Sequence, residues 1–136
     1  MSAADNFIDT SVLLYLLSAE AAKAERVEEL LVAGGTTSVQ VLNEFAAVAT
    51  RKLRMSIADV REILGTVRTV CGVEPVAAAT HDRALDLAER YGFSFYDAVL
   101  VAAAVLAGCS RLYSEDLQHG QLIDRRLRIV NPFRAG

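Results

Sequence analysis

The sequence predicts an α/β fold with three layers, in which helices cover both faces of a central parallel sheet of four to five strands. Short apolar runs, typical of buried strands, alternate with longer segments of helical periodicity. The helix predicted over 98–107 is apolar almost all round, which is typical of a helix in the middle of a packed domain. With 136 residues, 53% of them hydrophobic, the chain can form a real core, so we expect one domain over 1–136.

The first half of the chain alternates between strands and helices. In order, we predict a strand at 6–8, a short helix at 12–17, a helix at 19–33, a strand at 36–38 and a helix at 39–53. Gly34 and Gly35 end the second of these helices, because glycine readily adopts the backbone conformation that follows a helix. Asp9 comes directly after the first predicted strand.

The second half continues the alternation. We predict a helix after Ser56, a strand at 73–77, a helix at 80–91 capped by Thr80, the apolar helix, a strand at 111–114 and a last strand at 128–133 that Pro132 ends. Two helix starts share the spacing of a capping box, a serine followed three residues later by an acid. These are Ser56 with Asp59 and Ser94 with Asp97.

Four acidic residues are predicted to meet at one edge of the sheet. Asp9 and Asp116 each follow a strand, and the carboxyl ends of parallel strands share an edge. Asp97 opens a helix whose N-terminus can point to that edge, and Glu44 lies about two turns into a helix that starts there. Converging carboxylates repel one another unless cations bind between them, and an oxygen-only site suits Mg²⁺ or Mn²⁺.

Each of these acids, taken alone, also has an ordinary structural explanation. Asp97 can complete a capping box, as Asp59 does in another helix, and Asp9 or Thr10 can cap the helix that follows it. A single glutamate on a helix, such as Glu44, is usually a solvated surface residue. Residue pattern alone therefore predicts an acidic metal site and leaves its chemistry open.

Composition limits the classes of function. The net charge of −3 argues against a protein that coats nucleic acid through basic charge, although divalent ions at an acidic site would supply local positive charge. Basic residues at 51–54 and 125–128 either solubilise the protein or follow an RNA backbone. Cys71 and Cys109 have no metal-ligand spacing, which predicts buried free thiols. With neither a secretion signal nor an apolar run long enough to span a bilayer, we expect a cytoplasmic protein with no membrane partner.

Four short motifs resemble the PIN-domain ribonucleases, and most closely the VapC-type toxins of prokaryotic toxin–antitoxin pairs. They are FIDTS near the start, NEF in the helix at 39–53, FYDA at the start of the apolar helix and LYSED after a late strand. The resemblance covers almost the whole chain. By position it implies an acidic, metal-binding quartet of Asp9, Glu44, Asp97 and Asp116.

The resemblance also assigns two serines. Ser11 matches the small hydroxyl or amide residue after the first acid, and Ser114 matches the Ser/Thr that orients the last acid or a water. Glu115 and Asp116 are adjacent, and the family spacing [ST]-x-D favours Asp116 as the fourth acid. The implied fold, a parallel sheet between helices, agrees with the fold predicted from the pattern.

The activity implied by the resemblance is hydrolysis of RNA phosphodiester bonds by a Mg²⁺- or Mn²⁺-dependent endoribonuclease toxin. Its implied partners are the RNA substrate, a second copy in a homodimer, and a cognate antitoxin that covers the crevice and inserts an arginine among the carboxylates. One alternative is a non-catalytic PIN-like module that binds RNA or protein. Another is a phosphatase of the haloacid-dehalogenase type, but that class needs a second aspartate at position 11, where Ser11 stands.

Overall fold

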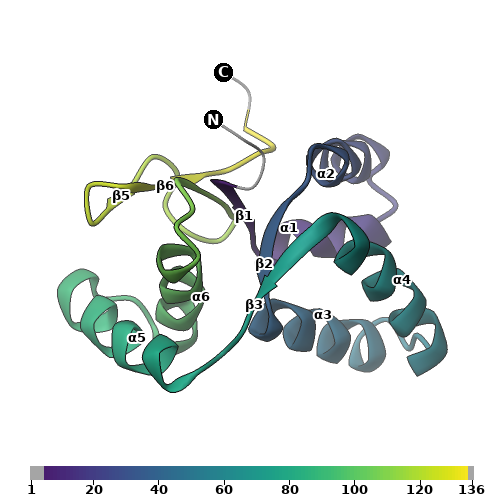
Figure 1. The fold of residues 1–136 in the computed structure, drawn as a ribbon. Helices are drawn as coiled ribbons and strands as arrows, with labels where there is room; N and C mark the ends of the chain where they lie inside the picture. The colour runs from purple at the N-terminus through teal and green to yellow at the C-terminus, as the bar shows by residue number, and fades with distance from the viewer. Residues whose placement is uncertain (1–4, 135–136) are drawn as a thin grey trace.

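A six-stranded, mostly parallel sheet lies at the centre of the computed structural model, which describes residues 5–134 (Figure 1). The strands are β1 (Asn6–Ile8), β2 (Gly35–Ser38), β3 (Cys71–Glu74), β4 (Arg111–Tyr113), β5 (Leu122–Ile123) and β6 (Leu127–Val130). Their order in the sheet is β3-β2-β1-β4-β6-β5, and β5 alone among the described strands pairs antiparallel with its neighbour. The predicted α/β class is confirmed, with one strand more than expected.

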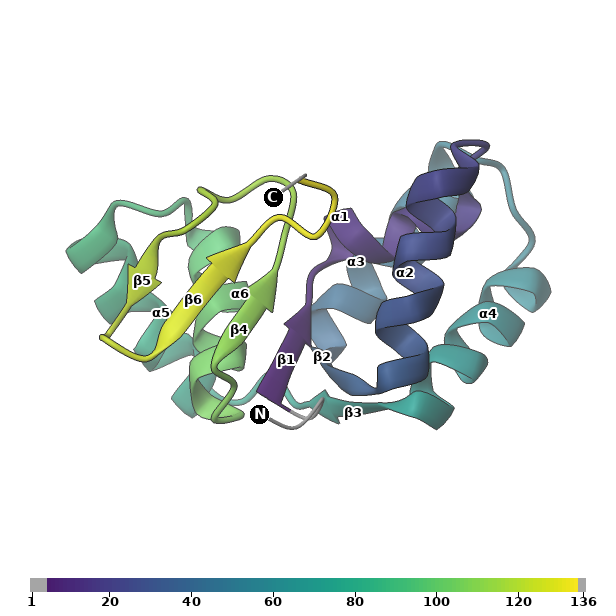
Figure 2. The same ribbon diagram turned by 90° about the horizontal axis from the view of Figure 1, so that it is seen from above.

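Helices cover both faces of this sheet. They are α1 (Thr10–Leu13), the 3₁₀ helix η2 (Leu14–Leu17), α2 (Ala21–Ala33), α3 (Val39–Arg51), α4 (Ile57–Val70), α5 (Ala78–Tyr91) and α6 (Phe95–Leu106). Helices α5 and α6 lie together on one side of the strands, and α2 and α4 lie on the other (Figures 1 and 2). None of the helices in residues 5–134 is long and apolar enough to cross a membrane.

Strand β1 lies in the middle of the sheet and determines where a site can form. It pairs in parallel with β2 on one side and with β4 on the other, so the connections leave it in opposite directions. Ligands in open α/β sheets bind outside the carboxyl ends of strands at such a switch point. The register pairs Ile8 with Tyr113, which puts Asp9 and Ser114 next to each other at the edge.

Helix α6 is buried as its apolar sequence predicts. Every residue from Ala98 to Ala104 is buried, and the helix packs against α5 and β2. The surrounding core includes large side chains of the central strands and of α3, such as Phe7, Phe45 and Leu112, each fully buried. This packing fixes the first turn of α6, and with it the backbone of Asp97, relative to the sheet.

The strand predicted at 73–77 lies two residues earlier, at Cys71–Glu74. Helix α4 continues to Val70 and the strand follows without a loop. Pro75 ends the strand, because proline has no N–H to donate to the sheet. The next helix also starts earlier than predicted, at Ala78. Thr80 therefore lies in its first turn, where its hydroxyl accepts a hydrogen bond from the Ala77 N–H (3.0 Å) instead of serving as the N-cap.

The strand β5 is absent from the prediction. It pairs with β6 through a tight turn in which Asp124 (φ 50°) and Arg125 (φ 61°) adopt left-handed backbone conformations. The turn spans the three residues 124–126, and left-handed positions in hairpin turns are normally filled by Gly or Asn. The last strand, predicted over 128–133, is shorter and ends at Val130. Cys71 and Cys109 are buried and belong to no disulfide, as predicted.

Candidate active site

Asp9 is a buried carboxylate at the carboxyl end of the central strand, with only 5% of its surface exposed. It is the N-cap of α1, where its Oδ1 accepts a hydrogen bond from the Thr10 N–H (2.6 Å). Its Oδ2 accepts two more, from the hydroxyls of Ser11 (2.9 Å) and Ser114 (2.8 Å). Burial opposes the charged form more strongly than these bonds favour it, and raises the pKa of Asp9 to about 6.

The two serines join the loop after β1 to the loop after β4. The Ser114 oxygen accepts from the backbone N–H groups of Asp116 and Leu117, both at 3.2 Å. The Ser11 oxygen accepts from the Glu115 N–H at 3.1 Å. Because a backbone N–H can only donate, each hydroxyl hydrogen is left for the Asp9 carboxylate. Both predicted serines therefore orient Asp9, and Ser114 also fixes the backbone of the predicted fourth acid.

Glu44 is held by two side chains that sequence analysis did not assign to the site. Ser38 caps α3 by accepting from the Val41 N–H (3.3 Å), and Glu44 lies in the second turn of that helix. The Thr10 hydroxyl donates to its Oε2 (3.1 Å) and the Gln40 amide donates to its Oε1 (2.9 Å). Gln40 lies four residues before Glu44 on the same helix face, so helical spacing is the signal that could have identified it.

Asp97 lies in the first turn of α6, where its N–H donates to the N-cap hydroxyl of Ser94 (3.4 Å). The cap predicted from the sequence is therefore present on the serine side. Within residues 5–134 the Asp97 carboxylate forms no hydrogen bond back to the Ser94 N–H, so half of the capping box is missing. Its carboxylate instead lines a cavity shared with the other acids.

Asp116 and Glu115 point into different surroundings. The Glu115 carboxylate accepts from the Tyr15 hydroxyl (2.6 Å) and pairs with the Lys23 ammonium (3.0 Å). Those contacts lower the pKa of Glu115. Asp116 has no such partner among the described residues. Partial burial of its carboxyl group, followed by the charges of Glu115 and Asp97, raises the pKa of Asp116. Asp116 lines the same cavity as the other three acids, and Glu115 does not.

The four acids come together at one cavity of about 330 Å³. They arrive from four separate segments: the loop after β1, helix α3, helix α6 and the loop after β4. The other polar residues that line it are Thr10, Ser11 and Tyr96, and no basic side chain of the described residues does so. Tyr96 is 68% exposed, which makes it an accessible aromatic group beside the acids.

The donor set suits a hard divalent cation. Every charged group lining the cavity is a carboxylate, and hard cations such as Mg²⁺ bind oxygen ligands. No three Asp, Glu, His or Cys side chains of residues 5–134 are close enough to form a ready-made metal site. Metal binding would therefore require the carboxylates to move closer together.

Comparison with known proteins places the chain in a family. Residues 7–122 match the PIN domain, so the chain belongs to the PIN domain family, and the resemblance predicted from its motifs is confirmed. No curated protein matches it.

Solved structures with the same fold include three toxin–antitoxin proteins. The Mycobacterium tuberculosis toxin VapC20, which cleaves the sarcin–ricin loop, is 26% identical, with a TM-score of 0.63 over 82% of this chain and 89% of that one. A toxin–antitoxin complex from Klebsiella pneumoniae is 19% identical, with a TM-score of 0.72 over 96% and 99%. VapBC2 from Rickettsia felis, bound to a promoter DNA fragment, is 14% identical, with a TM-score of 0.64 over 91% and 97%.

Proposed function

We propose that this protein is a metal-dependent endoribonuclease of the toxin type, which hydrolyses RNA phosphodiester bonds at the acidic cavity. The observation that carries the proposal is the convergence of Asp9, Glu44, Asp97 and Asp116 on one cavity that no basic side chain of the described residues lines. Membership of the PIN domain family and the similarity to VapC20 support it.

Each acid has a stated part in this proposal. Asp9, Glu44, Asp97 and Asp116 hold Mg²⁺ or Mn²⁺, which when bound polarises the phosphoryl group and makes water a better nucleophile. Ser11 and Ser114 orient the Asp9 carboxylate, and Thr10 and Gln40 orient that of Glu44. The exposed ring of Tyr96 offers a surface on which an unpaired RNA base can stack.

The first test compares wild type with Asp97→Asn on total RNA, with Mg²⁺ or Mn²⁺ and then with EDTA. Asparagine keeps the size and capping capacity of the side chain and removes the charge. Asp59→Asn is a matched control, because Asp59 occupies the same position behind the Ser56 cap of α4. We expect discrete, metal-dependent fragments from wild type and the control, and none from Asp97→Asn with its circular dichroism unchanged.

The alternative function is a non-catalytic PIN-like module that binds RNA or protein. One observation favours it: the described residues contain no ready-made metal cluster. The same experiment separates the two functions, because a binding module would leave RNA intact with every ion. An RNA-binding module would also retain RNA in a filter-binding assay, and a protein-binding module would not.

We propose three further properties by analogy. A cognate antitoxin neutralises the protein, as suggested by the toxin–antitoxin complexes among its structural neighbours, and an arginine of that antitoxin binds among the carboxylates. The protein forms a homodimer and works in the cytoplasm, where its two buried cysteines stay reduced. Identifying the protein that co-purifies from the native host tests the first property, and sedimentation of the purified chain tests the second.

A further inference from the structure

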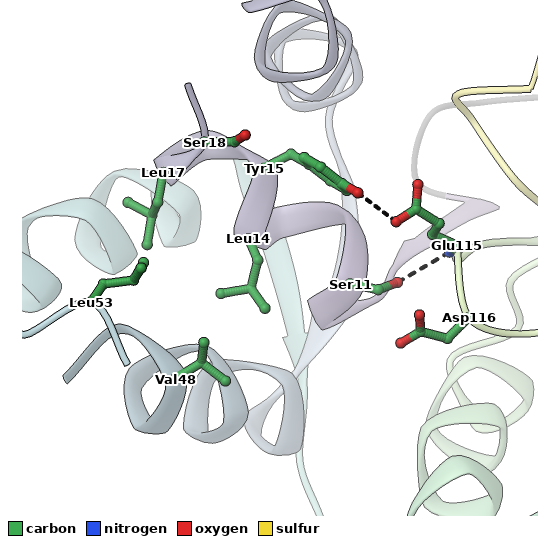
Figure 3. A pocket seen from close by; sticks show the side chains of 9 residues that line it. All are labelled: Ser11, Leu14, Tyr15, Leu17, Ser18, Val48, Leu53, Glu115 and Asp116. Atoms are coloured by element: carbon green, nitrogen blue, oxygen red, sulfur yellow. Dashed lines mark hydrogen bonds between the residues drawn. The ribbon is translucent and has the colours of Figure 1, made fainter. Parts of the chain in front are cut away.

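A second cavity, of about 440 Å³, lies beside the acidic one, and its two ends differ in chemistry (Figure 3). At one end the side chains are aliphatic: Leu14, Leu17, Val48 and Leu53. At the other end are oxygen-bearing side chains, including those of Ser11, Glu115 and Asp116. The volume falls within the range of about 300–1,000 Å³ typical of ligand pockets. A ligand that fits both ends has one apolar part and one polar part, and the polar part lies beside the acidic residues that are proposed to bind metal.

The two cavities adjoin each other. Ser11, Leu14, Val48 and Asp116 line both of them. A molecule whose phosphate lies at the acids can therefore extend directly into the second cavity. Figure 3 shows the direction of that extension, which runs from Asp116 at the polar end, past Ser11, to the four aliphatic side chains.

Of the two acidic side chains at the polar end, Glu115 has its charge compensated. The Glu115 carboxylate pairs with Lys23 (3.0 Å) and accepts from Tyr15 (2.6 Å). The Lys23 ammonium also donates to the Tyr15 oxygen (3.1 Å), so this hydroxyl both donates and accepts. Glu115 therefore lines the cavity as half of an ion pair and does not repel a polyanion as an isolated charge does.

Three exposed basic residues adjoin the apolar end in the chain. Leu53 is flanked in the chain by Arg51, Lys52 and Arg54, and all three basic residues are exposed. Leu53 itself is 49% exposed at the mouth of the cavity. Exposed basic side chains beside an apolar hollow suit a single-stranded nucleic acid, whose phosphates bind the cations while a base leaves the solvent.

We propose that the apolar end of this cavity binds one unstacked nucleobase, from a nucleotide next to the scissile phosphate. This inference rests on the proposed ribonuclease function and extends it to substrate binding. Ser18 also lines the cavity, near the aliphatic side chains. Its oxygen accepts a hydrogen bond from the Glu20 N–H (3.0 Å), so its hydroxyl hydrogen is available to a ligand. With aliphatic walls and one small donor, the subsite buries the faces of a base without reading the pattern of its edge. It therefore increases affinity for any base at that position.

The experiment combines a protein variant with an RNA lacking one base. A short RNA that wild type cuts is prepared as a series, each member with a single abasic nucleotide, and kcat/KM is measured with Mn²⁺. Leu53→Trp fills the cavity at an exposed position, where the larger side chain does not disturb the core. Val32→Trp is the control, because Val32 is an 87% exposed residue on α2 that lines neither of these two cavities.

For wild type, we expect one abasic position next to the cut to lower kcat/KM by about tenfold, the effect typical of losing one bound base. Replacing the base there with any other base should have little effect. Leu53→Trp should lower cleavage of the intact RNA by a similar factor, and combining the two changes should cost no more than either alone. Val32→Trp should behave as wild type.

Multiplicative losses for the combined change would overturn the proposal, because they would mean that the base and the cavity act independently. A strong preference for one base at this position would also overturn it, since the subsite would then read base edges. If wild type cleaves none of the RNAs with either ion, the proposed ribonuclease function itself is wrong, and this outcome differs from both others.

Discussion

Burial of Asp9 makes the stability of the metal-free protein depend on pH. The pKa of Asp9 is about 6 in the folded protein and 3.8 as its ordinary value. Between these values the folded state binds more protons than the unfolded state, so this group's contribution to stability falls as pH rises from 4 to 6. Asp9→Asn cannot ionise. Its free energy of unfolding in EDTA should gain about 3 kcal/mol relative to wild type between pH 3.5 and 7.

Urea denaturation across this pH range measures the difference. The exposed Asp82→Asn variant on α5 controls for the loss of an acidic charge and should follow wild type throughout. A difference between Asp9→Asn and wild type that does not change with pH would contradict the assigned environment of Asp9. At neutral pH the buried charge is then a cost to the fold that a bound cation would offset.

The two serines that orient Asp9 should differ in their importance for stability. Ser114→Ala removes a donor to Asp9 and leaves the N–H groups of Asp116 and Leu117 without an acceptor, at a fully buried position. Ser11→Ala also removes a donor to Asp9, but it leaves only one N–H, that of Glu115, without its acceptor, and Ser11 is half-buried. We expect Ser114→Ala to cost roughly 2–3 kcal/mol and Ser11→Ala about 1 kcal/mol. Equal losses in urea denaturation would show that the two backbone N–H groups are satisfied by water.

At the scale of single residues, the sequence indicated the acids better than it indicated the side chains that hydrogen-bond to them. Asp9 and Asp116 could be placed because each follows a strand, and parallel strands share an edge. Thr10 could not, because its role depends on Glu44 reaching back from another element to the loop after β1, whereas Gln40 could have been found from its spacing of four residues to Glu44 on the same helix. The family spacing favoured Asp116 over Glu115, and the contacts of Glu115 with Tyr15 and Lys23 add a physical reason that spacing does not contain.

At the scale of elements, helix caps allow the structural and functional roles of Asp97 to be separated. Ser94 caps α6 and Ser56 caps α4, each by accepting from the N–H of an aspartate three residues later. Ser94→Ala and Ser56→Ala should each lower the free energy of unfolding by about 1 kcal/mol. Only Ser94→Ala should also reduce RNA cleavage, because the first turn of α6 carries a carboxylate of the acidic cavity. Equal cleavage by the two variants, at equal loss of stability, would argue that the position of this turn is unimportant for activity.

The elements that the sequence predicted less well are those whose boundaries depend on tertiary contacts. Apolar periodicity located α3, α4 and α6, because each buries a continuous stripe or surface. Strand β3 was displaced because pairing with β2 selects Cys71–Glu74, and only Pro75 signals its end. The two-residue strand β5 has no pattern of its own, and its turn uses Asp124 and Arg125 in place of the usual glycine. Its pairing with β6 is what defines it.

At the scale of the whole molecule, the candidate site joins segments that are far apart in the sequence. Its four carboxylates come from positions 9 to 116, on both sides of the central strand β1. An ion bound to all four would link α3 and α6 to the loops after β1 and β4, and it would bind only the folded state. Binding of a ligand to the folded state alone stabilises it by about 2.7 kcal/mol at a concentration 100 times Kd.

Mn²⁺ should therefore raise the Tm of wild type by several degrees, and EDTA should reverse the rise. Asp97→Asn should lose most of this shift, whereas Asp59→Asn, with the same change of charge at the same position of another helix, should keep it. The measurement needs no substrate, so it tests the metal site independently of RNA cleavage. An equal shift for both variants would mean that the ion binds elsewhere. The absence of a shift in wild type would support the binding module, because the proposed hydrolysis relies on a bound cation to make water a better nucleophile.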